Sequence, residues 1–100
     1  MLAEAISPQI IETIQSTVRT MLGDYDITSC EIAMKEDAAG DDAIFVDVRY
    51  RLSTAEFDPQ KSAGVRSAIW RKLYDLGERR VPYIRHHLPE GQIVKATHVF

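Results

Sequence analysis

Apolar residues recur at helical spacing near the start of the chain. Ser7 and Pro8 are typical of a helix N-terminus, because serine accepts free backbone amides and proline suits the first helical position. The apolar residues that follow recur at helical spacing, so they share one face of a helix: Ile10, Ile11, Ile14, Val18, Met21 and Leu22. This spacing and the stop at Gly23 predict an amphipathic helix over residues 8–22.

Two strands follow, because the period of the pattern changes from helical to alternating. Residues 27–35 place Cys30, Ile32 and Met34 on one face. Residues 43–52 alternate more clearly, with Ile44, Val46, Val48, Tyr50 and Leu52 on one face and mostly charged residues on the other. The acidic, glycine-containing segment 36–42 between them fits a wide hairpin loop. A sheet with one apolar face is expected to be covered on one side only.

Asp58 and Pro59 repeat the helix-start signal, and a helix is expected over residues 59–76, ending at Gly77. Its expected inner stripe is Ala63, Arg66, Ile69, Trp70, Leu73 and Leu76. Pro82 suits the first position of a further short helix over residues 82–88. Residues 92–99 then predict a last strand, with Ile93, Val94, Ala96 and Val99 as packing residues.

The predicted order is therefore helix, strand, strand, helix, short helix, strand. If the last strand lies beside the first, the long crossover can take the favoured right hand. The resulting fold is an α+β two-layer sandwich, in which a three-stranded antiparallel sheet of order 3-1-2 carries its helices on one face. A chain of 100 residues is expected to form one domain over residues 1–100.

Composition narrows the class of protein. The chain is 45% apolar and 27% charged, as is ordinary for a soluble globular protein. No apolar run approaches the ~20 residues that span a bilayer, and the N-terminus lacks the pattern of a secretory signal. Cys30 is the only cysteine, which rules out an internal disulfide and favours a cytoplasmic location.

Catalytic and metal-binding patterns are weak. Cys30 falls on the packed side of its strand, no phosphate-binding glycine loop is present, and neighbouring His86 and His87 would diverge on a helix. Zinc would need Cys30 or His98 as further ligands, brought in by folding. The acidic loop lacks the alternation of a calcium-binding loop. We therefore expect no enzyme, no metal site and no cofactor.

Basic and aromatic residues concentrate in residues 71–87. The first half of the chain carries ten acidic against three basic residues, and the second half five against nine. Arginine and tyrosine are favoured at protein interfaces, and arginine also binds phosphate. We expect a non-catalytic protein-interaction or accessory module without membrane contact, whose partner is another protein or a second copy. Self-pairing with the acids of the first half and nucleic-acid binding remain open. The predicted partner-binding residues are Arg71, Lys72, Arg79, Arg80, Tyr83, Arg85 and His86.

The order of elements resembles the type II KH arrangement of RNA-binding and ribosome-associated domains. Such domains hold RNA through a Gly-x-x-Gly loop between the two later helices. The corresponding turn here reads Leu76, Gly77, Glu78, Arg79, Arg80, with one glycine only. The resemblance therefore implies a nucleic-acid-binding domain of KH-like topology without that loop, and no binding residue is carried over from it.

Overall fold

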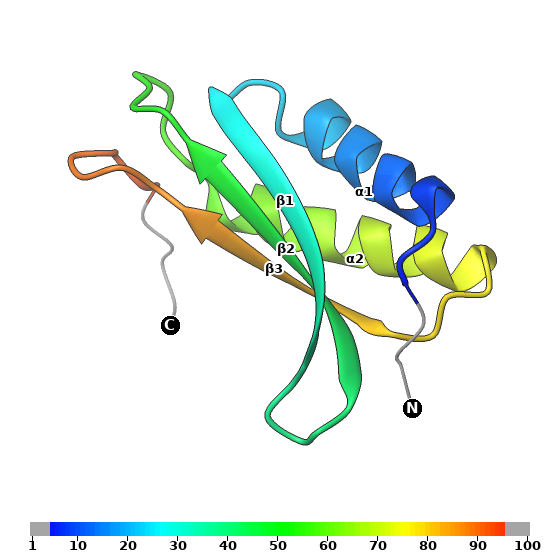
Figure 1. The fold of residues 1–100 in the computed structure, drawn as a ribbon. Coiled ribbons are helices and arrows are strands. Elements are labelled where there is room, and N and C mark those ends of the chain that lie inside the picture. The colour runs from blue at the N-terminus through cyan, green and yellow to red at the C-terminus, as the bar shows by residue number, and fades with distance from the viewer. Residues whose placement is uncertain (1–4, 96–100) are drawn as a thin grey trace, which may run out of the picture.

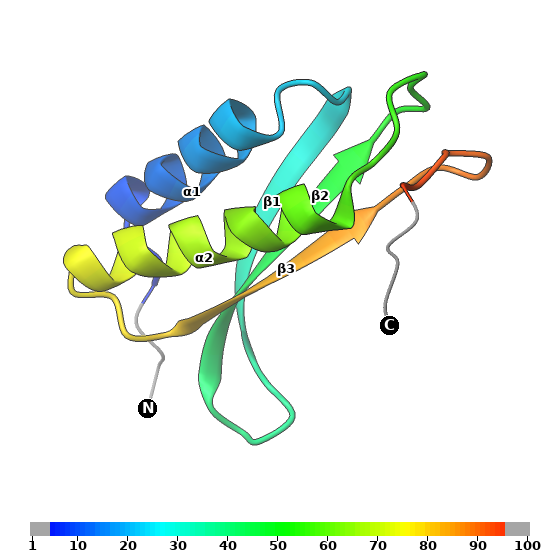
Figure 2. The same cartoon turned by 180° about the vertical axis from the view of Figure 1, so that it is seen from behind.

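The computed structural model describes residues 5–95 as two helices and three strands (Figure 1). Both helices lie on the same face of a single sheet, which Figure 2 shows from behind. The fold is therefore α+β with its helices on one face, as the sequence predicts. The elements are α1 (Pro8–Met21), β1 (Ile27–Glu36), β2 (Asp42–Tyr50), α2 (Pro59–Asp75) and β3 (Val81–His87).

Each helix begins at the residue that the sequence predicts. The Ser7 hydroxyl accepts the backbone N–H of Ile10 at 3.3 Å, and the Asp58 carboxylate accepts that of Gln60 at 3.0 Å. These bonds satisfy amides that have no partner within the helix. The polar caps and the prolines that follow them therefore fix where α1 and α2 start.

The sheet has the order β1-β2-β3, so the predicted order 3-1-2 is wrong. β1 and β2 form the predicted antiparallel hairpin, with Ile32 opposite Val46. β3 pairs with the other edge of β2 and runs parallel to it, so the sheet is mixed instead of antiparallel. Because α2 carries the chain back along the sheet before β3 begins, β2 and β3 point the same way.

β3 occupies residues that the sequence suggested would be a short helix, so that prediction is also wrong. Val81, Tyr83 and Ile84 are residue types that favour strands. Pro82 is compatible with an edge strand, where a missing N–H need not interrupt the sheet. The predicted strand over residues 92–99 lies partly outside the described residues. Within them, only Val94 forms an isolated bridge, to Phe57.

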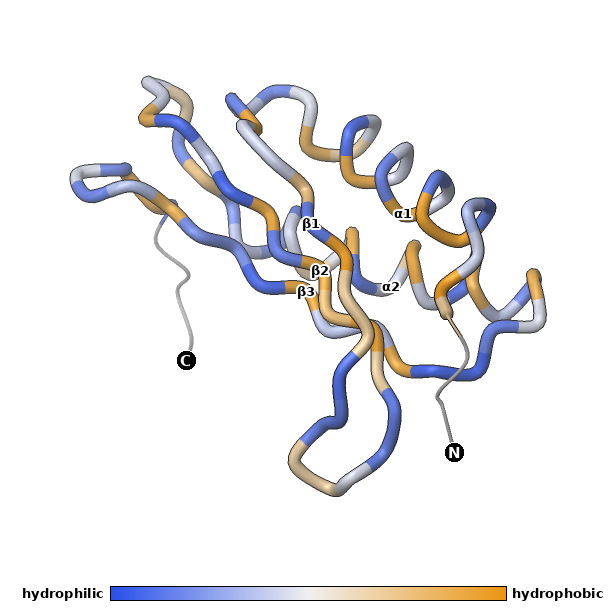
Figure 3. The backbone as a smooth tube through the Cα atoms, viewed as in Figure 1, coloured by the Kyte–Doolittle hydropathy of each residue, from blue (hydrophilic) through white to orange (hydrophobic). Residues whose placement is uncertain are grey.

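The core lies between the helices and the inner face of the sheet. Figure 3 shows apolar segments of α1, α2 and the strands facing one another. β2 contributes the fully buried Ile44, Val46 and Val48, and α1 contributes Ile14 and Val18. In α2 the buried residues are Val65, Ile69 and Leu73, whereas Trp70 is exposed. The predicted inner stripe of α2 is thus confirmed at Ile69 and Leu73 and wrong at Ala63, Arg66, Trp70 and Leu76, which are exposed.

Candidate functional site

The seven predicted partner-binding residues do not share one surface, because residues 81–87 form a strand. Side chains of a strand alternate between the two faces of the sheet. Tyr83 and Arg85 consequently lie on the face away from the helices, and His86 lies on the helix side. Arg71 and Lys72 belong to α2, and Arg79 and Arg80 to the turn after it.

Two of the predicted residues hold parts of the fold together. The Arg80 guanidinium donates to the Glu78 carboxylate at 2.5 Å and also contacts the sulfur of Met34 on β1. Both charged side chains of that pair are more than four-fifths buried. Lys72 donates to the Thr17 hydroxyl on α1 at 3.2 Å. Arg80 therefore ties the turn to the hairpin, and Lys72 ties α2 to α1.

Arg85 belongs to a cluster of charges on the open face of the sheet. Its guanidinium donates twice to the Asp47 carboxylate, at 2.8 and 2.9 Å, and His87 Nε2 lies 2.7 Å from the same carboxylate. Hydrogen bonding to Arg85, assisted by His87 and opposed by partial burial, lowers the pKa of Asp47 to about 2. Arg85 is thus paired within its own sheet.

Two aromatic rings lie beside this cluster. Phe45 and Tyr83 are register partners on β2 and β3, and their rings stack with centroids 5.3 Å apart. The Arg85 guanidinium lies 5.0 Å from the centre of the Phe45 ring. The Tyr83 hydroxyl donates to Asp37 in the hairpin loop at 3.3 Å. The open face therefore combines stacked rings with charges that already have partners.

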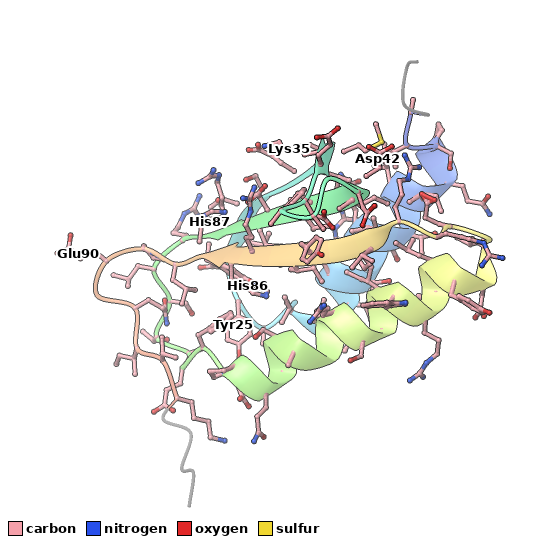
Figure 4. The ribbon with its side chains drawn as sticks, turned by 90° about the horizontal axis from the view of Figure 1, so that it is seen from below. Tyr25, Lys35, Asp42, His86, His87 and Glu90 are labelled. Atoms are coloured by element: carbon pink, nitrogen blue, oxygen red, sulfur yellow. The ribbon has the colours of Figure 1, made fainter. Side chains whose placement is uncertain are left out.

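His86 faces the opposite way, into an aromatic cluster of the core. Figure 4 shows it on the side of Tyr25 and α2, whereas His87 lies across β3. His86 Nδ1 is 2.7 Å from the Tyr50 hydroxyl, and its ring packs 5.4 Å from that of Phe57. Burial, with the nearby His87 as a second cause, lowers the pKa of His86. This environment favours the uncharged form of His86.

Acidification should therefore destabilise the protein through His86. Because its pKa is lower in the folded state than the ordinary value near 6.5, the unfolded chain binds the proton more readily. The free energy of unfolding should be highest above pH about 6.5 and should fall as the pH drops below that value. Thermal melting between pH 7.5 and 5 measures this effect.

His86→Gln is the control for this titration, since glutamine can hydrogen-bond to Tyr50 but does not ionise in this range. The variant should show a weaker dependence of melting temperature on pH than the natural chain. Equal slopes for the two proteins would mean that other groups control stability in this range.

A basic and aromatic surface does exist, on the outer side of α2. Trp70 and Tyr74 follow Arg66 at intervals of four residues, so the three side chains share one helix face. Trp70 is 44% exposed and Tyr74 is 66% exposed. The Arg66 guanidinium lies 5.7 Å from the centre of the Trp70 ring. We call this face, together with the exposed residues Arg71 and Arg79, the α2 surface.

Sequence reasoning assigned Trp70 to the core and thereby missed the centre of this surface. One signal was available. Val65, Ile69 and Leu73 also recur every four residues and contain only aliphatic side chains. Choosing that stripe as the buried one would have left Arg66 and Trp70 outside. Of the predicted residues, Arg71 is exposed on α2 and Arg79 is exposed in the turn after it, and within residues 5–95 neither forms an ion pair.

The geometry of residues 5–95 does not favour a metal site or a nucleophilic cysteine. Across that range, no group of three His, Cys, Asp or Glu side chains is arranged to hold a metal ion. Cys30 is half-buried, and burial raises the pKa of its thiol, which disfavours the reactive thiolate. In the same part of the chain, neither helix is long and apolar enough to cross a bilayer.

Comparison with known proteins found no similar protein. No family model, no curated protein and no solved structure matches the chain. The function must therefore be argued from the surfaces described above.

Proposed function

We propose that this chain is a non-catalytic protein-interaction module that binds another protein through the α2 surface. The observation that carries the proposal is the joint exposure of Trp70 and Tyr74 beside arginines. Tryptophan, tyrosine and arginine are the residue types that contribute most to binding energy at protein interfaces. A large aromatic side chain left in water gains free energy when a partner covers it.

The charge of the α2 surface indicates an acidic partner. Arg66, Arg71 and Arg79 are exposed, and Asp75 is the one exposed acid that α2 places among them. Opposite charge on a partner would speed its association and fix its orientation. We therefore propose a protein partner that presents carboxylates around an apolar pocket for Trp70.

The double variant Trp70→Ala/Tyr74→Ala tests this proposal. Both side chains are exposed and alanine is the best helix former, so the melting temperature should change little. Partner recovery should fall by about tenfold or more, because losing such an anchor costs about 2 kcal/mol or more. The measurement is quantitative mass spectrometry of proteins cross-linked to the tagged chain in its own cells.

A double variant on the exposed side of α1, Glu12→Ala/Thr20→Ala, provides the matched control. It should recover the same proteins as the natural chain. If the α2 variant also recovers them in undiminished amounts, the α2 surface is not the binding surface.

Nucleic-acid binding is the second candidate, favoured by the stacked rings of Phe45 and Tyr83 next to Arg85 on the open face. Bases stack on such rings, and binding to phosphates weakens as salt rises. Titration with labelled single-stranded RNA and duplex DNA at increasing salt separates the two candidates. Salt-sensitive RNA binding that is lost in Tyr83→Ala but kept in the α2 variant would favour this candidate over the first.

A further inference from the structure

The Trp70 side of α2 lies next to the outer edge of the sheet. α1 packs beside β1 and α2 beside β3, so the outer edge of β3 lies on the side of α2 away from α1 (Figure 2). Measured around the helix from the buried Ile69, Trp70 points about 100° to one side and Lys72 about 60° to the other. Lys72 donates to Thr17 of α1, so Trp70 is on the β3 side.

β3 is an edge strand with one side open. It pairs with β2 on its inner side, and within residues 5–95 no other strand pairs with it. Figure 4 shows β3 in front of the sheet, with α2 alongside it. The pairing with β2 is regular from Val81 to His87, so the open side of β3 is a continuous strand edge.

The backbone groups of Ile84 and His86 are expected to point outwards from this edge. In a parallel pair, every second residue directs its backbone groups towards the neighbouring strand. Pro82 has no N–H to donate to β2, which indicates that it belongs to the outward-facing set. Ile84 and His86 belong to the same set, whereas the amides of Tyr83 and Arg85 are expected to face β2.

Charge on this side of α2 indicates an acidic occupant. Arg66, one helical turn before Trp70, contacts the Trp70 ring, and no carboxylate of residues 5–95 lies within ion-pairing distance of it. Asp75, the exposed acid of α2, is rotated about 120° from Ile69 towards the α1 side. A second copy of the chain would bring another Arg66 to the same side, whereas an acidic protein would complement the charge.

We propose that the acidic partner of the α2 surface contributes an extended segment that adds to the outer edge of β3, bonds to the backbone of Ile84 and His86, and places a carboxylate beside Arg66. Strands of one sheet lie about 4.8 Å apart, so the added segment would lie on the side to which Trp70 points. Backbone hydrogen bonds supply affinity in this mode of binding, and the side chains of the α2 surface supply selectivity. The inference rests on the proposed function, because it states how a partner of that surface binds.

Selection from a random peptide library displayed on phage, with the full chain as bait, supplies the probe. Selected peptides should carry acidic residues. Their dissociation constant, measured by fluorescence polarisation, should rise about tenfold in Arg66→Glu and in Trp70→Ala, because the first turns attraction into repulsion and the second removes an aromatic contact. Arg19→Glu on α1 is the matched control and should bind as the natural chain does. Thermal melting first confirms that each variant is folded.

Amide hydrogen exchange measured by NMR tests the addition of a strand. In the chain alone, the amides of Ile84 and His86 should exchange quickly, and those of Tyr83 and Arg85 slowly. Bound peptide should slow exchange at Ile84 and His86 about tenfold or more, because these amides then have partners. Tyr83 and Arg85 are the internal reference and should change little.

The possible failures are distinguishable. Peptides that need Arg66 and Trp70 but leave exchange at Ile84 and His86 unchanged would overturn strand addition and leave the proposed function standing. Selection without enrichment over an unrelated protein, or peptides that bind both variants as tightly as the natural chain, would also overturn the inference. The proposed function is decided separately, by the cross-linking of Trp70→Ala/Tyr74→Ala. Slow exchange at Ile84 and His86 that appears as the chain alone is concentrated would assign the edge to a second copy and overturn the acidic partner.

Discussion

Val46→Asp should abolish cooperative folding. Val46 is completely buried on the central strand β2, between its register partners Ile32 and Ile84. A carboxylate there has no water and no cationic partner among the aliphatic side chains. The effective cost of burying an unpaired charge is several kcal/mol. Because the whole free energy of unfolding of a small domain is only about 5–15 kcal/mol, the variant should be unfolded or close to it.

Circular dichroism during thermal melting measures this effect, and Ser29→Asp is the matched control. Ser29 lies on β1 opposite Arg49, so an introduced carboxylate would face a cation. Ser29→Asp should unfold cooperatively, within a few degrees of the natural melting temperature. A cooperative transition of Val46→Asp near that temperature would contradict the assignment of the inner face of the sheet.

Ile69→Ala should produce the second largest effect. Ile69 is completely buried where α2 packs on the core, and truncation of such a residue costs about 2–5 kcal/mol. Trp70→Ala, one residue further along the same helix, should cost clearly less, about 1 kcal/mol, because 44% of the Trp70 surface is exposed. Urea unfolding of the two variants measures both values.

This pair of variants tests which face of α2 is buried. The sequence interpretation placed both residues on the inner stripe and would predict two large losses. A loss of several kcal/mol in Trp70→Ala would restore that interpretation and remove the centre of the α2 surface.

Local signals in the sequence were sufficient for most of the fold. Ser7 and Asp58, each followed by proline, identified the helix starts, and the strict alternation around Val46 identified β2 and its buried face. These features depend on neighbouring residues only. The hairpin also follows from two adjacent alternating segments, which explains why β1 and β2 pair as predicted.

The identity of β3 could not be inferred in the same way. Val81, Tyr83 and Ile84 show strand preferences, but Pro82 and the charged neighbours match a helix start equally well. Residues 81–87 become a strand because β2 has an edge to pair with, where Phe45 and Val46 are the register partners of Tyr83 and Ile84. That edge belongs to the tertiary structure and is absent from the local pattern.

The candidate site depended on this same element. With residues 82–88 read as a helix, Arg80, Arg85 and His86 were expected on one exposed surface. In the structure Arg80 contacts Glu78 within the turn before β3, and Arg85 and His86, on opposite faces of β3, contact Asp47 and Tyr50. Arg71 and Arg79 are exposed, as the prediction of a binding surface requires. Their role in binding a partner stays a prediction.

The parallel pairing of β2 with β3 also constrains the order of events when the ribosome makes this chain. α1 and the β1–β2 hairpin require only sequence that has already emerged by Tyr50. The second edge of β2 stays uncovered until α2 has been made and β3 has followed it. Because synthesis proceeds at about 5–20 residues per second, this edge is exposed to other nascent chains for a few seconds. Chaperone contacts during biogenesis should therefore concentrate on Phe45 and its neighbours.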